Sequence, residues 1–218
     1  MSSRKFWLGR RMRTDLTKAT ARAVTRFRTK MANALLDLRF GKLLRGTEPT
    51  RYTRTGAYAT ANSSYAAVLD LFRGRVKPSD VLVDVGCGKG RVINAWLLEG
   101  YRNRLVGVEL DPEVAARTRA RLRRFSNVSI IGGDIISNFP DDGTLFYLYN
   151  PFDAPVMARF KHRLKESLSR RTLGEATVIY NNCRHARVFS EDDACRIEFG
   201  ELEHPYAVIH VCVRRPIA

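Results

Sequence analysis

Residues 81–91, VLVDVGCGKGR, constrain the fold of this chain more than any other segment. A mostly apolar strand carries Asp84, and Gly86, Gly88 and Gly90 then form a turn in front of a helix. Because glycine has no Cβ, the backbone of such a turn can approach a ligand closely, and the first N–H groups of the helix lie beside it. Dinucleotide-binding turns have the spacing G-x-G-x-x-G. Here the third glycine comes one residue earlier, which predicts a ligand site of another kind.

From residue 80 onward, apolar runs alternate with helical patterns, which is typical of a parallel α/β sheet. Strands are expected over 81–85, 104–109, 128–131, 144–149 and 176–181, with helices over 89–99, 112–124 and 154–169. Two final strands, 195–200 and 206–213, have no long helix between them, so we expect an antiparallel hairpin at the sheet edge. An additional helix is expected over 62–73, capped by Asn62 or Ser63.

Three further polar positions follow or end expected strands. Glu109 ends the second strand, where a carboxylate can accept hydrogen bonds from both hydroxyls of a ribose. Asp134, beside Ile135, follows the third strand, and Asn150 ends the fourth in the segment LYNPF. Each has a simpler interpretation as a surface acid or a turn residue. Open α/β sheets bind ligands at the carboxyl ends of their strands, so we expect these side chains to line one site.

As a set, these motifs make residues 50–190 resemble a bacterial group of class I S-adenosylmethionine (SAM)-dependent methyltransferases. The pattern of this group begins with DxGCGKGR, found here at residues 84–91, and GVEL, found at 107–110. It continues with GD at 133–134, NPF at 150–152, and Y-x-N followed by a histidine at 180–185. Asn182-Cys183 departs from the Asn-Pro pair expected after the fifth strand. The resemblance implies an α/β fold with a Rossmann-like seven-stranded sheet of order 3-2-1-4-5-7-6, last strand antiparallel and helices on both faces. It also implies SAM as cofactor and S-adenosylhomocysteine as its product.

The resemblance also implies roles for individual residues. The expected cofactor-binding residues are Asp84, Gly86, Cys87, Gly88, Gly90, Glu109, Asp134, Ile135 and Asn150. Asn150 and His185 are the catalytic candidates, Asn150 because its amide can donate and accept at once, and His185 as a general base after the fifth strand. A base is required only if the acceptor loses a proton, and a structural role for His185 stays open. Tyr52 and Tyr58 are candidates to close over SAM.

The whole chain has a net charge of +16, and this positive charge is concentrated in its N-terminal quarter. Residues 1–54 carry 15 Lys and Arg against three acidic residues, a net charge of +12. Residues 55–218 carry a net charge of +4. We therefore divide the chain into a basic arm, 1–54, and a SAM-dependent methyltransferase domain, 55–218.

Within the arm, residues 15–44 predict a basic amphipathic helix, because Val24, Phe27, Met31, Leu35 and Leu38 fall on one stripe. Three partners are compatible with this helix: an anionic membrane surface, a nucleic acid, or the chain's own catalytic domain. No segment approaches the roughly 20 apolar residues that span a bilayer. Cytoplasmic location is expected, with peripheral membrane association as an alternative.

The leading functional hypothesis is methyl transfer from SAM to a nitrogen or oxygen of a protein, a small molecule, or a lipid or glycan intermediate. A catalytically inactive SAM-binding scaffold, whose arm binds a membrane or nucleic acid, is the alternative from another class. A dinucleotide oxidoreductase is disfavoured by the glycine spacing. No metal site is expected, because no two of the four cysteines have the spacing of a zinc site.

Overall fold

The computed structural model describes residues 24–25, 27–44, 46, 63–171 and 174–213. The chain divides into two compact units between Leu43 and Leu44. The first unit contains a helix over residues 24–39, of which residue 26 is not described. The second contains the α/β sheet. The predicted boundary at residue 54 and the predicted helical residues 15–23 lie outside the described residues.

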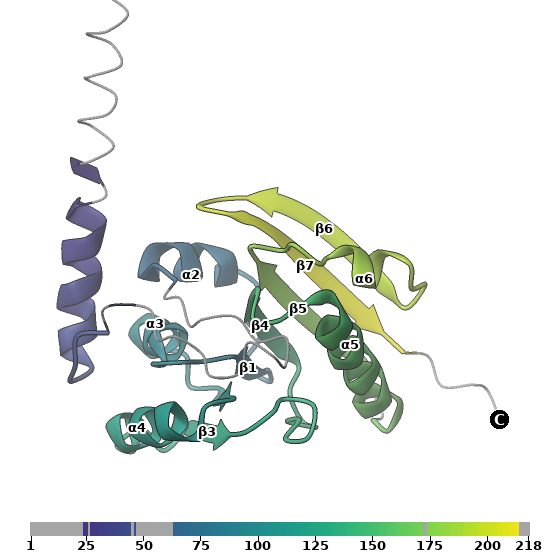
Figure 1. Ribbon diagram of the computed structural model, residues 1–218, viewed down its shortest axis with the longest axis horizontal. Helices are drawn as coiled ribbons and strands as arrows, with labels where there is room; N and C mark the ends of the chain where they lie inside the picture. Colours follow the sequence, from purple (N-terminus) through teal and green to yellow (C-terminus); the bar gives the residue numbers. More distant parts are fainter. Residues whose placement is uncertain (1–23, 26, 45, 47–62, 172–173, 214–218) are drawn as a thin grey trace, which may run out of the picture. The chain divides into compact units, whose positions relative to one another are not determined.

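The second unit is built on one seven-stranded sheet (Figure 1). Its strands are β1 (Val81–Val85), β2 (Arg104–Glu109), β3 (Val128–Gly132), β4 (Leu145–Tyr149), β5 (Glu175–Asn181), β6 (Cys195–Glu201) and β7 (Pro205–Cys212). They lie in the order β3-β2-β1-β4-β5-β7-β6. The first five strands are parallel, and β7 runs antiparallel to both β5 and β6. The Rossmann-like topology and the terminal hairpin are therefore confirmed.

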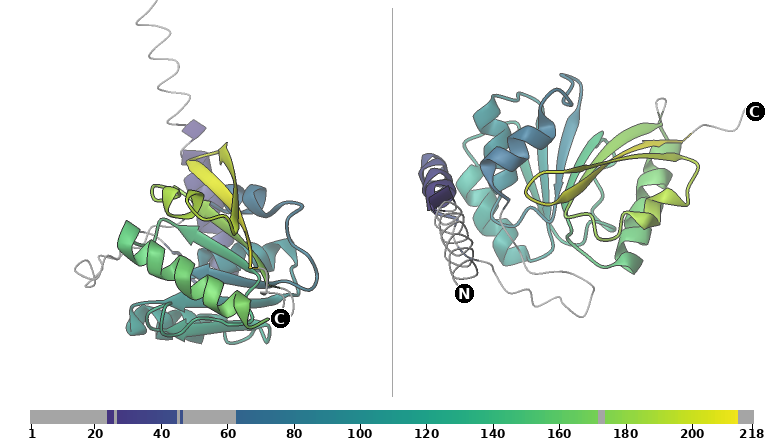
Figure 2. Two further views of the ribbon diagram at one scale, coloured as in Figure 1. Left: turned by 90° about the vertical axis from the view of Figure 1, so that its right-hand side faces the viewer. Right: turned by 90° about the horizontal axis from the view of Figure 1, so that it is seen from above.

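Helices cover both faces of this sheet (Figure 2). They are α2 (Tyr65–Phe72), α3 (Arg91–Glu99), α4 (Pro112–Leu122), α5 (Ala154–Ser169) and the short α6 (Arg187–Ser190). Consecutive strand residues point to opposite faces. Phe146 of β4 packs against Phe160 of α5, whereas its neighbour Tyr147 packs against Phe72 of α2. The two helices therefore lie on opposite faces of β4.

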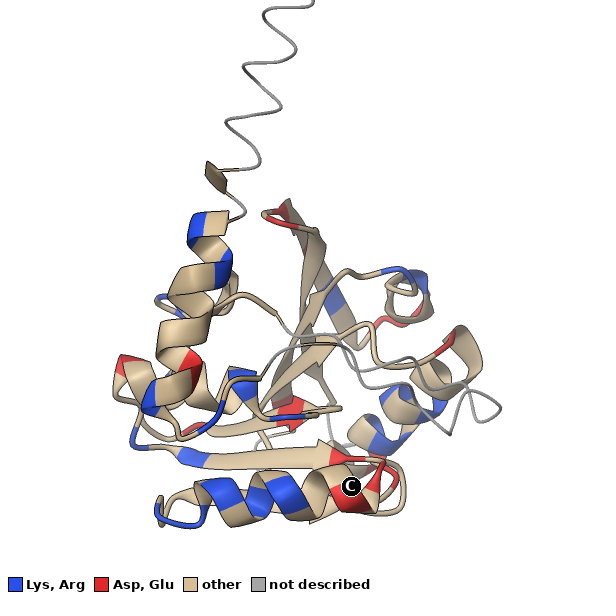
Figure 3. Cartoon of the chain, turned by 60° about the vertical axis from the view of Figure 1, so that its left-hand side comes forward, with Lys and Arg blue, Asp and Glu red and all other residues tan. Residues whose placement is uncertain are grey.

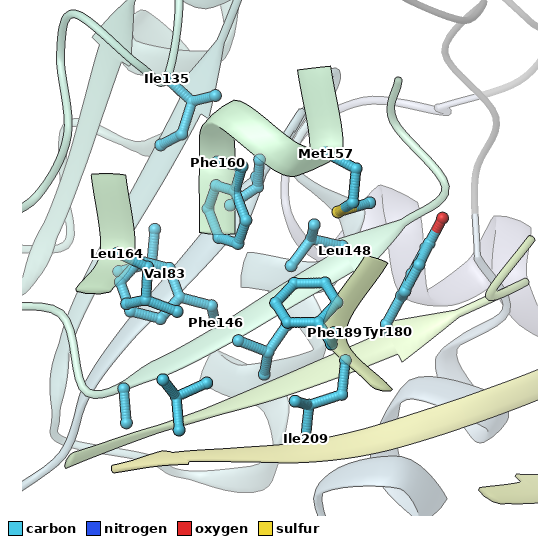
Figure 4. Close-up of a cluster of buried hydrophobic side chains, with 14 of the residues drawn as sticks. Val83, Ile135, Phe146, Leu148, Met157, Phe160, Leu164, Tyr180, Phe189 and Ile209 are labelled. Atoms are coloured by element: carbon cyan, nitrogen blue, oxygen red, sulfur yellow. The ribbon is translucent and has the colours of Figure 1, made fainter. Parts of the chain in front are cut away.

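A hydrophobic core cluster lies between the sheet and α5 (Figure 4). Val83 and Leu148 from the sheet meet Met157, Phe160 and Leu164, which recur at helical spacing along α5. All five side chains are fully buried. Burial of each such side chain stabilises the fold by about 1.5–3 kcal/mol, so this face anchors the central strands on which the candidate site depends.

Two helix starts differ from the sequence-based prediction for local reasons. Ser64 caps α2, with its Oγ accepting from the Ala67 N–H, whereas the Ser63 hydroxyl hydrogen-bonds the Tyr147 hydroxyl instead. The predicted cap at Asn62 or Ser63 is thus wrong for Ser63, and Asn62 is not among the described residues. Helix α3 begins at Arg91 rather than 89, because Gly90 has a φ of 75°, outside the helical region.

The helix of the first unit exposes the apolar stripe predicted for it. Val24, Phe27, Met31, Leu35 and Leu38 are all exposed, between 44% and 65% of each residue's surface. No helix among the described residues is long and apolar enough to cross a membrane.

Candidate functional site

The glycine turn joins the carboxyl end of β1 to α3. The N–H groups of Gly86 and Cys87 donate to the Val108 carbonyl at 2.8 and 3.0 Å, which fastens the turn to β2. Gly86, Gly88 and Gly90 all have positive φ, between 50° and 75°. Only glycine adopts this conformation without strain, so all three positions suit glycine. Gly90 is the N-cap of α3, and no side chain of residues 63–171 or 174–213 caps this helix, so the positive end of the helix dipole lies at the turn.

Helix α4 fixes the conformation of this turn from outside. The Thr118 hydroxyl donates to the Gly88 carbonyl at 2.8 Å, and the Arg121 guanidinium donates to the Lys89 carbonyl at 2.6 Å. Arg121 also donates to the Asn94 side chain of α3. These bonds turn the carbonyls of Gly88 and Lys89 toward α4.

Glu109 places its carboxylate directly at the turn. One oxygen accepts the Gly88 N–H at 2.7 Å, and the other accepts the Asp111 N–H at 3.0 Å. The residue is buried, with 6% of its surface exposed. A carboxylate oxygen can accept more than one hydrogen bond, so the group retains capacity for the hydroxyls of a ligand. The structure thus brings together the two features that the sequence predicted to share a site.

Asp84 lies beneath the same turn with an unsatisfied oxygen. Among the described residues, its buried Oδ2 has no hydrogen-bond partner. Burial, and to a smaller extent repulsion from Glu109, raises the pKa of Asp84 well above its usual value. An unpartnered buried carboxyl group is costly, and a cationic ligand group at this position would offset the cost. Asp84 is therefore the point in the site most suited to a positively charged ligand.

Cys87 lies within the turn but is not an activated nucleophile. Burial, and to a smaller extent repulsion from Asp84 and Glu109, raises the pKa of its thiol well above its usual value. Its Sγ lies against β2, where a Cβ added at Gly107 would come within 2.7 Å of it. The side chain thus fills space between the turn and β2.

Asn150 and His185 come together around the hydroxyl group of Tyr180. This hydroxyl donates to the Asn150 side-chain oxygen at 2.8 Å and accepts the His185 backbone N–H at 3.3 Å. Asn150 is buried with a φ of 42°, an uncommon conformation for a residue other than glycine. A Cβ on Gly86 would lie 3.3 Å from Pro151, so the Asn150 segment adjoins the glycine turn. Among the described residues, the buried Nε2 of His185 has no hydrogen-bond partner.

Asp134 and Ile135 follow β3 at the same sheet edge. The Asp134 carboxylate accepts the Ile136 N–H at 3.1 Å and lies 4.0 Å from the Arg159 guanidinium. Ile135 belongs to the buried core cluster, with 6% of its surface exposed. Their expected contacts with the cofactor stay predictions.

Sequence reasoning missed a second polar network at this edge. The Tyr147 hydroxyl joins the Ser63 hydroxyl and the Asn181 amide, at 2.8 and 3.2 Å. Burial raises the pKa of Tyr147 despite these two bonds. The Ser64 hydroxyl donates to the carboxylate of Glu203, between β6 and β7. These hydrogen-bonded pairs lie 34 to 139 residues apart in the sequence, so no local pattern predicts them. The only sequence signal for the network was the polar character of strand residues such as Tyr147.

The candidates Tyr52 and Tyr58 are outside the described residues, and two basic side chains at the start of α3 bind backbone carbonyls. Lys89 donates to the Gly46 carbonyl at 3.3 Å, and the Arg91 guanidinium donates to the Leu44 carbonyl at 3.1 Å. Within the described part of the chain, no group of three His, Cys, Asp or Glu side chains is arranged to hold a metal ion.

Comparisons with known proteins agree with this architecture. Residues 82–179, from β1 to β5, match the family model described as a methyltransferase domain. The chain has the Rossmann-like methyltransferase fold. A methyltransferase of Podospora anserina, PaMTH1, solved with S-adenosylhomocysteine, superimposes with a TM-score of 0.53 at 15% identity, over 68% of this chain and 79% of that one. An RNA methyltransferase of Salinibacter ruber, also solved with S-adenosylhomocysteine, superimposes with a TM-score of 0.52 at 21% identity. The match covers 72% of this chain and 97% of that one.

A third structural neighbour is longer than this chain. The pyocyanin biosynthetic protein PhzM superimposes with a TM-score of 0.54 at 17% identity, over 67% of this chain. The match spans about half of PhzM, 54% of its length. The likeness thus lies in the sheet and its helices.

Proposed function

We propose that this protein transfers a methyl group from SAM to a nitrogen or oxygen acceptor. The observation that carries the proposal is the position of Glu109, a buried carboxylate bound to the Gly88 N–H at the centre of the glycine turn. It stands where a nucleoside ligand would present two ribose hydroxyls. The match of residues 82–179 to a methyltransferase domain supports this assignment.

The residues around the turn fit SAM in charge as well as in shape. SAM carries a positively charged sulfur and an ammonium group. Asp84 and Glu109 are both acidic and both buried beside the turn, and Asp84 Oδ2 has no hydrogen-bond partner in the part of the chain that the structure describes. A cation near two carboxylates relieves their mutual repulsion. A dinucleotide, whose pyrophosphate is anionic, would increase it, so the charge of the site supports SAM over NAD.

In the proposed reaction the cofactor supplies a methyl group activated by the positive charge on sulfur. The chain's own residues would bind and orient the two reactants and exclude water from them. Such positioning can lower the activation barrier by about 7–11 kcal/mol. Glu109 would hold the ribose, the glycine turn would hold the amino acid end, and the Asn150 amide would orient the acceptor. The bond from Tyr180 holds the Asn150 amide in one orientation. If the acceptor loses a proton, His185 is the proposed base, with its imidazole taking that proton.

The segment Asn150-Pro151-Phe152 supports a planar nitrogen as acceptor, because a rigid turn presents an amide that can both donate and accept. Oxygen acceptors, including lipid and glycan intermediates, are the other class. We propose a cytoplasmic location because all four cysteines are free thiols, which suits a reducing compartment.

Calorimetric titration of the purified chain with SAM, S-adenosylhomocysteine and NAD tests the cofactor. We expect binding of the first two and not of NAD, and tight NAD binding alone would overturn the proposal. Radiolabelled SAM incubated with cell extract, then separated into lipid, protein, nucleic acid and metabolite pools, tests the reaction. Label in one pool that disappears with Glu109→Gln identifies the acceptor class, whereas binding without any transfer would favour a scaffold.

A further inference from the structure

The helix of residues 24–39 carries an exposed apolar stripe formed by Val24, Phe27, Met31, Leu35 and Leu38. We call these five residues the exposed stripe. Their spacing of three or four residues places them on one face of the helix. Large apolar side chains gathered on an exposed face are uncommon on monomeric soluble proteins and mark interaction sites. The stripe is therefore suited to a partner surface that removes it from water.

Cationic side chains border the exposed stripe on both sides. At 100° per residue, Arg28 and Arg39 lie along one flank and Lys30 along the other, and all three residues are exposed. Asp37, the only acidic residue among the described positions of this helix, is buried and lies off the stripe. Figure 3 shows the Lys and Arg positions along the helix. The surface that covers the stripe must therefore tolerate apolar groups at its centre and attract cations at its rim.

An anionic lipid surface meets both requirements. In an amphipathic helix that lies in the membrane plane, apolar side chains enter the boundary between headgroups and acyl chains. Lys and Arg then reach the lipid phosphates, and each of these charges strengthens attachment to an anionic membrane. The net charge of +12 over residues 1–54 strengthens that attraction. We propose that this helix binds the protein to anionic lipid surfaces through the exposed stripe, without crossing the bilayer.

A nucleic acid explains the charge but not the stripe. Its phosphates would bind Arg28, Lys30 and Arg39 and leave the five apolar side chains in water. Single-stranded nucleic acids are bound by aromatic side chains that stack on successive bases, and Phe27 is the only aromatic residue in the exposed stripe. The proposal concerns membrane attachment and does not depend on which methyl acceptor the protein uses.

The test is flotation or sedimentation of the full-length chain with vesicles of phosphatidylcholine alone or mixed with phosphatidylglycerol, at low and high salt. Phe27→Ser with Leu35→Ser removes apolar area from the stripe. Arg28→Gln with Lys30→Gln removes two flanking charges. Phe199→Ser is the matched control, because Phe199 is an exposed aromatic residue of β6, 70% exposed and outside the helix. Equal thermal transitions for all variants establish that each is folded.

We expect binding only to the anionic vesicles, weakened by salt. The affinity should fall about tenfold or more in the stripe variant and about 30-fold in the charge variant, while the control binds as the unchanged chain does. Retention of full vesicle affinity by the stripe variant would overturn the proposal. So would binding of the unchanged chain to a labelled oligonucleotide but not to anionic vesicles, which would assign the arm to nucleic acid instead.

Discussion

At the scale of single residues, the site is defined by two buried carboxylates with different surroundings. Glu109 accepts backbone hydrogen bonds on both oxygens, which stabilise its charge, whereas Asp84 has an oxygen without a partner among the described residues. The two groups lie close enough for their charges to repel each other. Glu109 is therefore suited to accept hydroxyl groups, and Asp84 to respond to the charge of what binds.

Replacing Glu109 by Gln should weaken SAM binding about 10- to 100-fold. The amide keeps the length of the side chain but loses the charge and half of the acceptor capacity, and hydrogen bonds to charged groups contribute about 1.5–3 kcal/mol. Calorimetric titration measures the change. Glu113→Gln, an exposed carboxylate in the first turn of α4, is the control and should bind SAM normally. Equal affinity of the two variants would remove Glu109 from the cofactor site.

Replacing Asp84 by Asn should stabilise the ligand-free protein while weakening SAM binding. Because the pKa of Asp84 is raised in the folded chain, its ionisation opposes folding as the pH rises above the usual Asp range. The Asn variant lacks this cost, so its advantage in Tm should grow with pH. An advantage of a few degrees near neutral pH is expected, since 1 kcal/mol corresponds to about 2–4 °C for a chain of this size.

Thermal melts of both ligand-free proteins between pH 5 and pH 8 measure this difference. Asp80→Asn is a comparison in a half-exposed position before β1, where the Asp80 carboxylate accepts from Lys77 and Thr144. That variant should lose stability, because the carboxylate has partners. A Tm difference for Asp84→Asn that shrinks as the pH rises would contradict the proposed cause.

At the scale of elements, the site depends on how closely the glycine turn packs against β2. Gly107 lies in β2 opposite Asp84 of β1, where strand pairing brings the two backbones together. A Cβ added there would approach Cys87 Sγ, Ile93 Cδ1 and Ile130 Cδ1 within 2.7–2.9 Å. The turn can therefore lie close to β2 only while residue 107 has no side chain.

Gly107→Ala should lower the free energy of unfolding by about 1–3 kcal/mol, because overpacking of a filled core forces neighbouring groups to move. Adding Cys87→Ala to the same chain should recover part of the loss, since it removes the nearest of the three overlaps. Denaturant unfolding of the two single variants and the double variant measures the coupling. Strictly additive losses would show that Cys87 is not the group that limits the space.

Elements with long periodic patterns were predictable, and those decided by tertiary contacts were not. Helix α5 matches its prediction at both ends, because its apolar spacing and its Asp153 cap are local signals. Helix α6 was missed, since four residues are too short to show a period. Ser64 caps α2 because the hydroxyl of the neighbouring Ser63 is hydrogen-bonded to Tyr147, which lies 84 residues away in the sequence. Likewise, Asn150 and His185 were predicted, but the Tyr180 hydroxyl that joins them was not.

At the scale of the whole molecule, charge and chemistry are divided along the chain. Residues 55–218 are close to neutral for their size, and they contain the sheet and the candidate site. Residues 1–54 carry most of the net positive charge. A domain that must bind a small cation gains little from a large positive charge of its own. This division suits an arm that recruits the protein to an anionic surface while the sheet binds the cofactor.

SAM should stabilise the second unit as a whole, because the ligand would contact the ends of several strands at once. A ligand at about 100 times its Kd contributes about 2.7 kcal/mol to a protein that binds it only when folded. For a chain of this size that corresponds to a rise in Tm of about 5–10 °C. Differential scanning calorimetry with SAM, S-adenosylhomocysteine and NAD measures it, and NAD should leave the Tm unchanged. The glutamine variant of Glu109 should show a smaller rise at the same SAM concentration, because its higher Kd reduces the saturation. An equal rise with NAD, or none with SAM, would mean that the glycine turn and its two carboxylates bind a different ligand.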